Sequence, residues 1–183
     1  MATVVYKIGN DISTDLIYPG RFMATVLPTE TPQFAFADDA AFNGKLKAKQ
    51  IPAGSVIVAG KNFGCGSSRE QAVSCLKGHE LIIIAKDFAR IFLQNGINLG
   101  LRTVSCPTMD AKEGDELEVT ETEVVNRTTG KKFAVVPLPK SRQAIIDAGG
   151  LIPYTRKRVL EQAAPWLATR AFLGAARKRD LGG

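Results

Sequence analysis

The chain has 183 residues, of which 45% are hydrophobic and 23% are charged, values that are typical of one soluble globular domain. Its net charge of +6 is uneven, since residues 151–183 hold seven basic and two acidic groups while residues 1–150 hold 17 basic and 16 acidic groups. The nearly neutral body argues against nucleic-acid binding, so the basicity belongs to a C-terminal tail that faces solvent or a partner.

The N-terminal part of the chain is predicted to alternate short elements with turns. Val4–Ile8 favours a strand that ends in the turn residues Gly9–Asp11, and Leu16–Tyr18 favours a second short strand. A loop is expected over residues 27–33, which contain two prolines and two threonines. The alanine, leucine and lysine content of Ala35–Lys49 then predicts a helix.

The middle of the chain pairs apolar strands with helices. Ser55–Ala59 and Leu81–Ala85 are short, apolar and rich in β-branched residues, which predicts two buried strands. Ser67–Leu76 is predicted to be a helix with Ser67 or Ser68 as its cap, and Phe88–Gln94 a short helix.

The second half of the chain favours strands. Ser141–Ala148 is predicted to be a helix that Gly149 and Gly150 close. The tail is predicted to form one or two short helices, with Pro165 as a break or as the first residue of the second, and to dock on its own domain or on another molecule. The strand candidates are Leu101–Val104, Glu116–Thr122, Val124–Asn126 and Phe133–Val136. The mixture indicates one α/β domain with a β-rich second half.

Signals for targeting and for metal binding are missing from the sequence. Apolar runs such as Leu81–Ala85 are too short to span a bilayer, and the N-terminus lacks the features of a signal peptide, so we expect a cytoplasmic protein without membrane contact. Cys65, Cys75 and Cys106 are not spaced as Cys-x-x-Cys, and His79 is the single histidine. We therefore expect neither a disulfide framework nor a metal site formed by this chain alone.

Gly60–Glu70, with the sequence Gly-Lys-Asn-Phe-Gly-Cys-Gly-Ser-Ser-Arg-Glu, carries the clearest chemical signal. A strand, a glycine-rich loop and a helix start bring free backbone N–H groups and the positive end of a helix dipole to one place. Ser67 and Ser68 add hydroxyl groups, and Arg69 can hold a carboxylate or phosphate with two hydrogen bonds. The glycine and lysine positions fit neither a Rossmann fingerprint nor a Walker A loop. The residues alone therefore predict an anion-binding loop of undetermined chemistry.

Four segments, in order, resemble the motifs of the swivelling domain of the aconitase superfamily, and most of all its isopropylmalate-type members. They are Gly9–Phe22, Gly60–Glu70, Asp87–Gly100 and Ala148–Tyr154, which together span most of residues 5–154. The resemblance implies a single three-layer β/β/α swivelling domain over residues 1–154. Residues 155–183 run past the end of the family pattern and are expected to form a basic, helical C-terminal extension.

The resemblance also implies a reaction and a partner. Members of the superfamily remove water from a hydroxy acid and add it back, and the hydroxyl leaves with help from a Lewis-acidic iron of a [4Fe–4S] cluster. The resemblance places the cluster on a large subunit, with which this chain would form a heterodimer or heterotetramer, and implies no cofactor bound by this chain alone. The chain would thus be a hydro-lyase subunit that acts on a small hydroxy-dicarboxylate and is inactive without its partner.

The motif positions assign roles to individual residues. Ser67 corresponds to the catalytic base, and Ser68 and Arg69 correspond to residues that bind the substrate carboxylate. Asp15 corresponds to an acidic position in or beside the site, and Gly66 is expected to support the loop. From the residues alone, a helix cap is the alternative role for Ser67, and a turn or capping carboxylate is the alternative for Asp15.

The loop after Arg21 bears on the substrate. In superfamily members that act on tricarboxylic acids, an arginine of this loop holds the extra carboxylate, and Ala24, followed by Thr25, stands at that position here. Burying an unpaired carboxylate is costly, so we predict a substrate with a small or apolar γ-group, first of all the isopropylmalate of leucine biosynthesis, unless Arg21 replaces the arginine. A dimethylmalate-, methylmalate- or homoaconitate-type dehydratase and a non-catalytic anion-binding module are the alternatives. Gln71 departs from the pattern, since superfamily members commonly carry histidine there.

Overall fold

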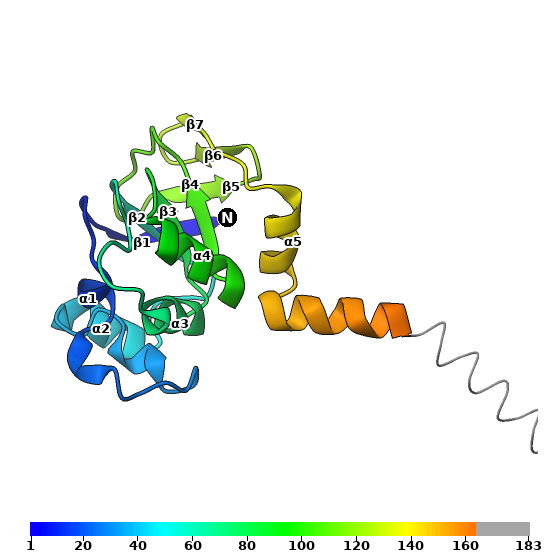
Figure 1. The fold of residues 1–183 in the computed structure, drawn as a ribbon. Coiled ribbons are helices and arrows are strands. Elements are labelled where there is room, and N and C mark those ends of the chain that lie inside the picture. Colours follow the sequence, from blue (N-terminus) through cyan, green and yellow to red (C-terminus); the bar gives the residue numbers. More distant parts are fainter. Residues whose placement is uncertain (164–183) are drawn as a thin grey trace, which may run out of the picture.

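Seven strands form one sheet in the order β4-β3-β2-β1-β5-β6-β7, and the computed structural model of the chain describes residues 1–163 (Figure 1). Strands β1 to β4 are parallel, whereas β5 pairs antiparallel with β1 and continues into an antiparallel meander. Each strand overlaps a segment that the sequence predicted to be extended. The strands are β1 Ala2–Lys7, β2 Val56–Ala59, β3 Ile82–Ala85, β4 Arg102–Ser105, β5 Glu116–Val119, β6 Glu123–Asn126 and β7 Lys132–Ala134.

The antiparallel part of the sheet folds over one face of the parallel part. After β7 the chain returns to β4, where the Val136 N–H donates to the Ser105 carbonyl oxygen at 2.8 Å. Val58 of β2 and Ile84 of β3 are buried in one core with Leu117 of β5, and helices cover the opposite face of the parallel strands. The architecture is the three-layer β/β/α arrangement that the family resemblance implied.

Helices form the third layer and explain why the central strands are apolar throughout. Ile57 and Ile83 point to the helices and are 0% exposed, so β2 and β3 are covered on both faces. The helices are α1 Thr14–Ile17, α2 Ala40–Lys47, α3 Glu70–Gly78, α4 Arg90–Leu99 and α5 Lys140–Asp147, with 3₁₀ turns η1 Gly20–Phe22 and η2 Thr31–Phe34. α5 packs against α4 at the edge of the sheet.

Several predicted elements differ from those observed, two of them because of the way a helix is capped. The predicted strand at Leu16–Tyr18 is wrong, because the Ser13 hydroxyl accepts a hydrogen bond from the Leu16 N–H at 3.1 Å and caps α1 instead. The helix predicted over Phe88–Gln94 begins later and runs on to Leu99, where Gly100 adopts a φ of 75° and ends it. In both places a capping group or backbone conformation, rather than apolar spacing, fixes the boundary.

Lys77 links the C-terminal ends of three helices by hydrogen bonds. It lies in the last turn of α3, and its ammonium donates to the Leu99 carbonyl oxygen at the end of α4. It also donates to the Gly149 carbonyl oxygen, at 2.7 Å, just beyond α5. Partial burial lowers the pKa of Lys77, while the negative ends of two helix dipoles favour its charge. The contact fixes α5 beside α4.

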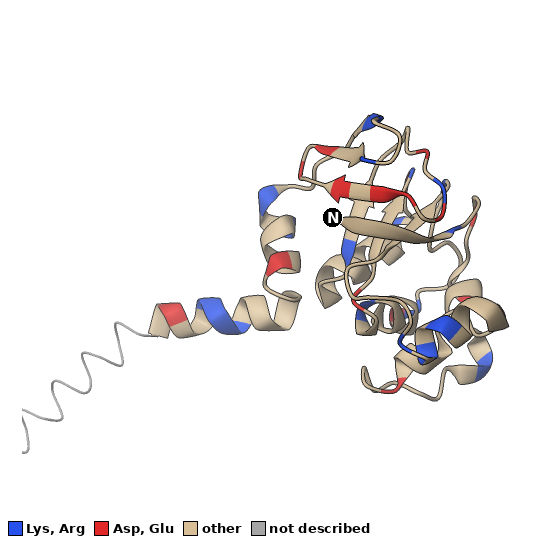
Figure 2. Ribbon diagram, turned by 180° about the vertical axis from the view of Figure 1, so that it is seen from behind, with Lys and Arg blue, Asp and Glu red and all other residues tan. Residues whose placement is uncertain are grey.

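The last described helix covers residues 151–163 and extends away from the body of the molecule (Figure 1). It crosses the predicted domain boundary after Tyr154, and Ile152 and Leu160 on it are 77% and 60% exposed. Figure 2 shows basic residues on this helix and acidic residues along β5. The predictions for the rest of the tail, including Pro165, lie outside the described residues. Within residues 1–163 no helix is long and apolar enough to cross a membrane.

Candidate functional site

Two loops at the carboxyl ends of β1 and β2 join to form the candidate site. The loop after β2 pairs with the loop after β1, because the Gly64 N–H donates to the Ile12 carbonyl oxygen at 2.7 Å. The Thr14 N–H likewise donates to the Cys65 carbonyl oxygen at 2.8 Å. Neighbouring parallel strands present their carboxyl ends at one edge of the sheet, which is where open α/β sheets bind ligands. The first and second sequence motifs are thus in direct contact.

Glycine is required where the β2 loop turns toward α3. Gly64 has a φ of 80°, and a Cβ atom there would lie 2.1 Å from Cγ of Phe92, closer than any real contact. Gly66 has a φ of 90° and faces the Thr14 hydroxyl oxygen, which would lie 3.6 Å from an added Cβ atom. These two glycines let the backbone pass between α1 and α4 and present the following serines.

Ser67 and Ser68 are exposed and precede the helix rather than cap it. The prediction of a helix that starts at Ser67 is wrong, because α3 begins at Glu70 and has Arg69 at its N-cap without a side-chain capping bond. The Ser67 carbonyl oxygen accepts from the Arg69 N–H at 2.8 Å and from the Thr14 hydroxyl at 2.9 Å. The backbone at Ser67 is therefore anchored on both sides while its hydroxyl stays free of a capping role.

Arg69 is held beside the serines by the loop after β1. Its Nη1 donates to the Asp15 carboxylate and, at 3.3 Å, to the Tyr18 carbonyl oxygen. The Arg69 side chain is 17% exposed and Asp15 is 58% exposed, so the pair lies at the surface of the loop cluster. A Cβ atom on Gly20 would lie 3.3 Å from Nη2 of Arg69. Within residues 1–163, only Nη1 makes bonds, which leaves Nη2 and Nε to grip a carboxylate.

Tyr18 connects Arg69 to the loop that was predicted to select the substrate. Its hydroxyl lies 3.1 Å from the Phe22 carbonyl oxygen and 3.3 Å from the Thr25 carbonyl oxygen, and burial raises the pKa of Tyr18. Tyr18 therefore remains a neutral donor at physiological pH and holds this loop closed around the exposed Ala24.

Arg21 directs its charge to Asp38. Its guanidinium forms an ion pair with Asp38, with Nη1 to Oδ2 at 3.3 Å, and lies 4.6 Å from the centroid of the Phe22 ring. The Asp38 carboxylate raises the pKa of Arg21, so the ion pair is favoured. Arg21 is therefore paired with Asp38, on the surface of the loop that contains Ala24.

The cysteines are spread over the fold. Cys65 lies in the loop, Cys75 in α3 and Cys106 after β4, and burial raises the pKa of Cys75 and Cys106. Within residues 1–163 no group of three or more His, Cys, Asp or Glu side chains could hold a metal ion. The described part of the chain does not provide the thiolates that an iron–sulfur cluster needs.

The structure brings most of the predicted site residues together and adds others. Ser67, Ser68, Arg69, Asp15 and Gly66 lie in one loop cluster, and Ala24 and Thr25 lie in the loop that Tyr18 attaches to it. Thr14, Tyr18 and Gly20 were not predicted to contribute. All three lie inside the first motif, so their position next to Asp15 was the available signal.

Comparison with known proteins gives matches over most of the chain. The model of the aconitase C-terminal domain matches residues 10–109. The 3-isopropylmalate dehydratase small subunit of Methanosarcina mazei is 44% identical over 163 residues, which cover 86% of this chain and 97% of that protein. The isopropylmalate/citramalate isomerase small subunit of Methanocaldococcus jannaschii is 45% identical over 163 residues, covering 86% of this chain and 94% of that protein.

A solved structure matches the fold as well. The crystal structure of 3-isopropylmalate dehydratase from Methanocaldococcus jannaschii superimposes with a TM-score of 0.80 at 39% sequence identity. The match covers 89% of this chain and 97% of the solved chain.

Proposed function

Because the chain belongs to the aconitase C-terminal domain family, we propose that it is the small subunit of a two-subunit hydro-lyase that isomerises isopropylmalate by removing and re-adding water. The observation that carries the proposal is the exposed Ser67–Arg69 loop, anchored to Asp15 at the carboxyl ends of two parallel strands. The similarity of the sequence to small subunits of isopropylmalate-type enzymes, and of the fold to a solved 3-isopropylmalate dehydratase, supports it.

In the proposed reaction, Ser67 acts as the base. Its ionised hydroxyl takes the proton from the carbon next to a substrate carboxylate, the C–H electron pair forms the double bond, and the hydroxyl on the neighbouring carbon leaves. Addition of water to the other carbon completes the isomerisation. Serine is a poor base at neutral pH, so its ionisation needs nearby positive charge. Arg69 and the N-terminus of α3 provide that charge within the same loop.

Arg69 and Ser68 are proposed to bind the substrate carboxylate. Charge that develops on this carboxylate during proton removal is stabilised by donors fixed in advance. The bond from Arg69 to Asp15 orients the guanidinium so that its unpaired nitrogens face the ligand. Asp15 is therefore proposed as a positioning residue, and Gly66 as the turn that presents Ser67.

The proposed partner is a large subunit that carries the [4Fe–4S] cluster. The described residues of this chain lack a suitable set of ligands, so they do not fit the cluster, and this chain is assigned proton removal and carboxylate binding. Ser67 and Ser68 are exposed, and a second surface that covers them would exclude water and strengthen both interactions. We propose a heterodimer or heterotetramer located in the cytoplasm, with residues 1–154 as the swivelling domain and residues 155–183 as its extension.

The loop at Ala24 supports a substrate with an apolar γ-group. Arg21 is engaged by Asp38, so a third carboxylate at this place would lack a partner. Citramalate, which carries a methyl group, is the second candidate, since one relative is named for both substrates and the small Ala24 side chain leaves room for either.

Reconstitution with the large subunit tests the proposal. The full chain would be combined anaerobically with a candidate cluster-binding large subunit and assayed on isopropylmalate, citramalate and citrate. We expect activity on isopropylmalate only with both chains, a loss of about 10³-fold in kcat for Ser67→Ala, and no loss for Ser141→Ala, an exposed serine on α5. Activity on citrate would contradict the role of Ala24. An assembled, cluster-loaded complex without activity on any of the three would favour a non-catalytic anion-binding module.

A further inference from the structure

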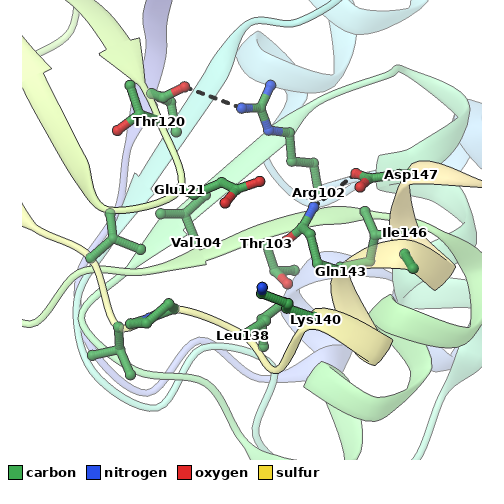
Figure 3. A pocket seen from close by; sticks show the side chains of 15 residues that line it. Arg102, Thr103, Val104, Thr120, Glu121, Leu138, Lys140, Gln143, Ile146 and Asp147 are labelled. Atoms are coloured by element: carbon green, nitrogen blue, oxygen red, sulfur yellow. Dashed lines mark hydrogen bonds between the residues drawn. The ribbon is translucent and has the colours of Figure 1, made fainter.

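A cavity of about 290 Å³ lies along the open edge of β4 and shares no residue with the Ser67 loop (Figure 3). β4 is the outer strand of the parallel part of the sheet, and the β5–β6 turn and α5 form the other walls. The cavity is lined in part by the apolar side chains of Val104, Val119, Val135 and Ile146. Its size suits a small metabolite with an aliphatic group.

Charged side chains of both signs surround this apolar floor. Arg102 and Lys140 bring positive charge, and Glu121 and Asp147 bring negative charge. Among residues 1–163, neither Lys140 nor Glu121 forms an ion pair. Two charges of opposite sign are therefore free to meet a ligand within one small cavity.

The Thr103 hydroxyl is an independent observation that points to a ligand at this cavity. It is 7% exposed, and its hydroxyl is a buried side-chain atom with no hydrogen-bond partner in the described part of the chain. Buried hydroxyl groups are nearly always paired, because leaving one unpaired costs free energy. Thr103 and Lys140 both line the cavity, where β4 and α5 form its walls (Figure 3). Lys140 is long and exposed, so its ammonium can reach a ligand in the cavity.

The backbone of β4 adds hydrogen-bond donors and acceptors on the edge of the strand that faces the cavity. The Ser105 carbonyl oxygen accepts from Val136 at the open edge of the strand. Backbone groups alternate in direction with a period of two residues, so the N–H and carbonyl of Thr103 point to the same edge. The cavity therefore combines an open strand edge, an unpaired hydroxyl and free charges.

We propose that this cavity binds a small zwitterion with an aliphatic side chain, that is, a free aliphatic α-amino acid. Its carboxylate would lie between Lys140 and the Thr103 hydroxyl, and its ammonium would face Asp147 and Glu121. A dianion would be repelled by the two carboxylates, and a simple cation would be repelled by Arg102 and Lys140. A ligand with one charge of each sign avoids both penalties, and its aliphatic group covers the apolar floor.

Calorimetric titration of the full 183-residue chain tests the proposal with L-leucine as the probe. Two analogues of the same shape serve as controls: 4-methylpentanoate, which lacks the ammonium, and 3-methylbutylamine, which lacks the carboxylate. We expect saturable binding of leucine at one site and affinity at least about tenfold lower for each analogue. Absence of saturable heat with leucine, or equal affinity for 4-methylpentanoate, would overturn the proposal.

Variants locate the binding in this cavity. Lys140→Gln and Asp147→Asn should each weaken leucine binding about tenfold, whereas Arg142→Gln, an exposed charge on the same helix that does not line the cavity, should not. Thr103→Val removes the hydroxyl at nearly constant shape, so it should weaken binding several-fold without lowering the stability of the free chain. Undiminished binding by Lys140→Gln and Asp147→Asn would place the ligand elsewhere. Because the chain is titrated without a large subunit, a negative result leaves the dehydratase proposal untouched.

Discussion

The loop around Ser67 and the antiparallel layer of β5 to β7 use polar residues in opposite ways. In the loop, the side chains of Ser67 and Ser68 are exposed, while their backbone is anchored. In the β layer, Asn126 is 0% exposed and donates from Nδ2 to the Asp115 carboxylate at 2.8 Å. Polar groups that are buried and paired stabilise the fold, whereas polar groups left open on a rigid frame are available to a ligand. Substitutions in the loop should therefore change activity without changing stability, and substitutions in the β layer should do the reverse.

After Ser67, the largest effect that would sharpen this contrast is expected at Arg69. Arg69→Lys keeps the charge but loses the planar fork that can hold a carboxylate with two bonds. We expect kcat/KM of the reconstituted enzyme to fall about 10²-fold, while the free energy of unfolding changes by less than about 1 kcal/mol, since lysine keeps a charge beside Asp15, whose carboxylate is 58% exposed. Steady-state kinetics and urea unfolding measure the two quantities. Arg142→Lys on α5 is the matched control, and a variant with full activity would remove Arg69 from the site.

The opposite result is expected at Asn126 in the β layer. Its Nδ2 donates to Asp115, and its Oδ1 accepts from the Thr129 N–H at 3.0 Å. Asn126→Ala leaves both partners without these bonds, so the free energy of unfolding should fall by about 2–3 kcal/mol. Urea unfolding checks the value, with the partly buried Asn98→Ala on α4 as the control. Once the variant is folded and assembled, its kcat/KM should be unchanged, and a specific loss of activity would break the comparison.

Tyr18 combines features of both regions, because its side chain is buried like Asn126 while its hydroxyl holds the loop that contains Ala24 and Thr25. Tyr18→Phe removes the hydroxyl that lies near the Phe22 and Thr25 carbonyl oxygens and keeps the ring in the core. We expect KM to rise about fivefold with kcat nearly unchanged, because the loop loosens while Ser67 is unaffected, and stability to fall by about 1 kcal/mol. Kinetics on isopropylmalate and citramalate measure the change. A drop in kcat with constant KM would show that Tyr18 acts on the chemical step instead.

The smallest expected effect is a pH dependence that originates in the β layer. The pKa of Asp115 is lowered because its carboxylate accepts the Lys112 N–H and the Asn126 amide. A carboxylate whose pKa is lower in the folded state stabilises the fold above its unfolded pKa of about 4, and this contribution is lost as pH falls through the folded pKa. The stability difference between the native chain and Asp115→Asn should therefore be constant from pH 7 to about pH 5 and shrink below about pH 4. Urea unfolding at each pH measures it, and a difference that grows on acidification would reverse the assignment.

Much of the fold follows from local sequence signals. The apolar, β-branched runs at β2 and β3 predict strands buried on both faces, because a solvent-facing strand would alternate with polar residues. Gly149 and Gly150 predict the end of α5, because glycine readily adopts the positive φ that closes a helix. Both residues have positive φ in the structure. Helix α1 was predicted as a strand and the start of α3 was placed too early, because a cap at Ser13 and a turn at Ser67–Arg69 outweigh residue preferences that span only a few positions.

The sequence by itself determined the strands of the sheet and, through four ordered motifs, the family, and it predicted an anion-binding loop. Only the tertiary structure brought Asp15 and Tyr18 to Arg69, directed Arg21 to Asp38 and left the Thr103 hydroxyl unpaired beside an open strand edge. The physical reason is that strand preference and backbone conformation depend on neighbouring residues, whereas ion pairs and cavities depend on which distant segments the sheet order places side by side.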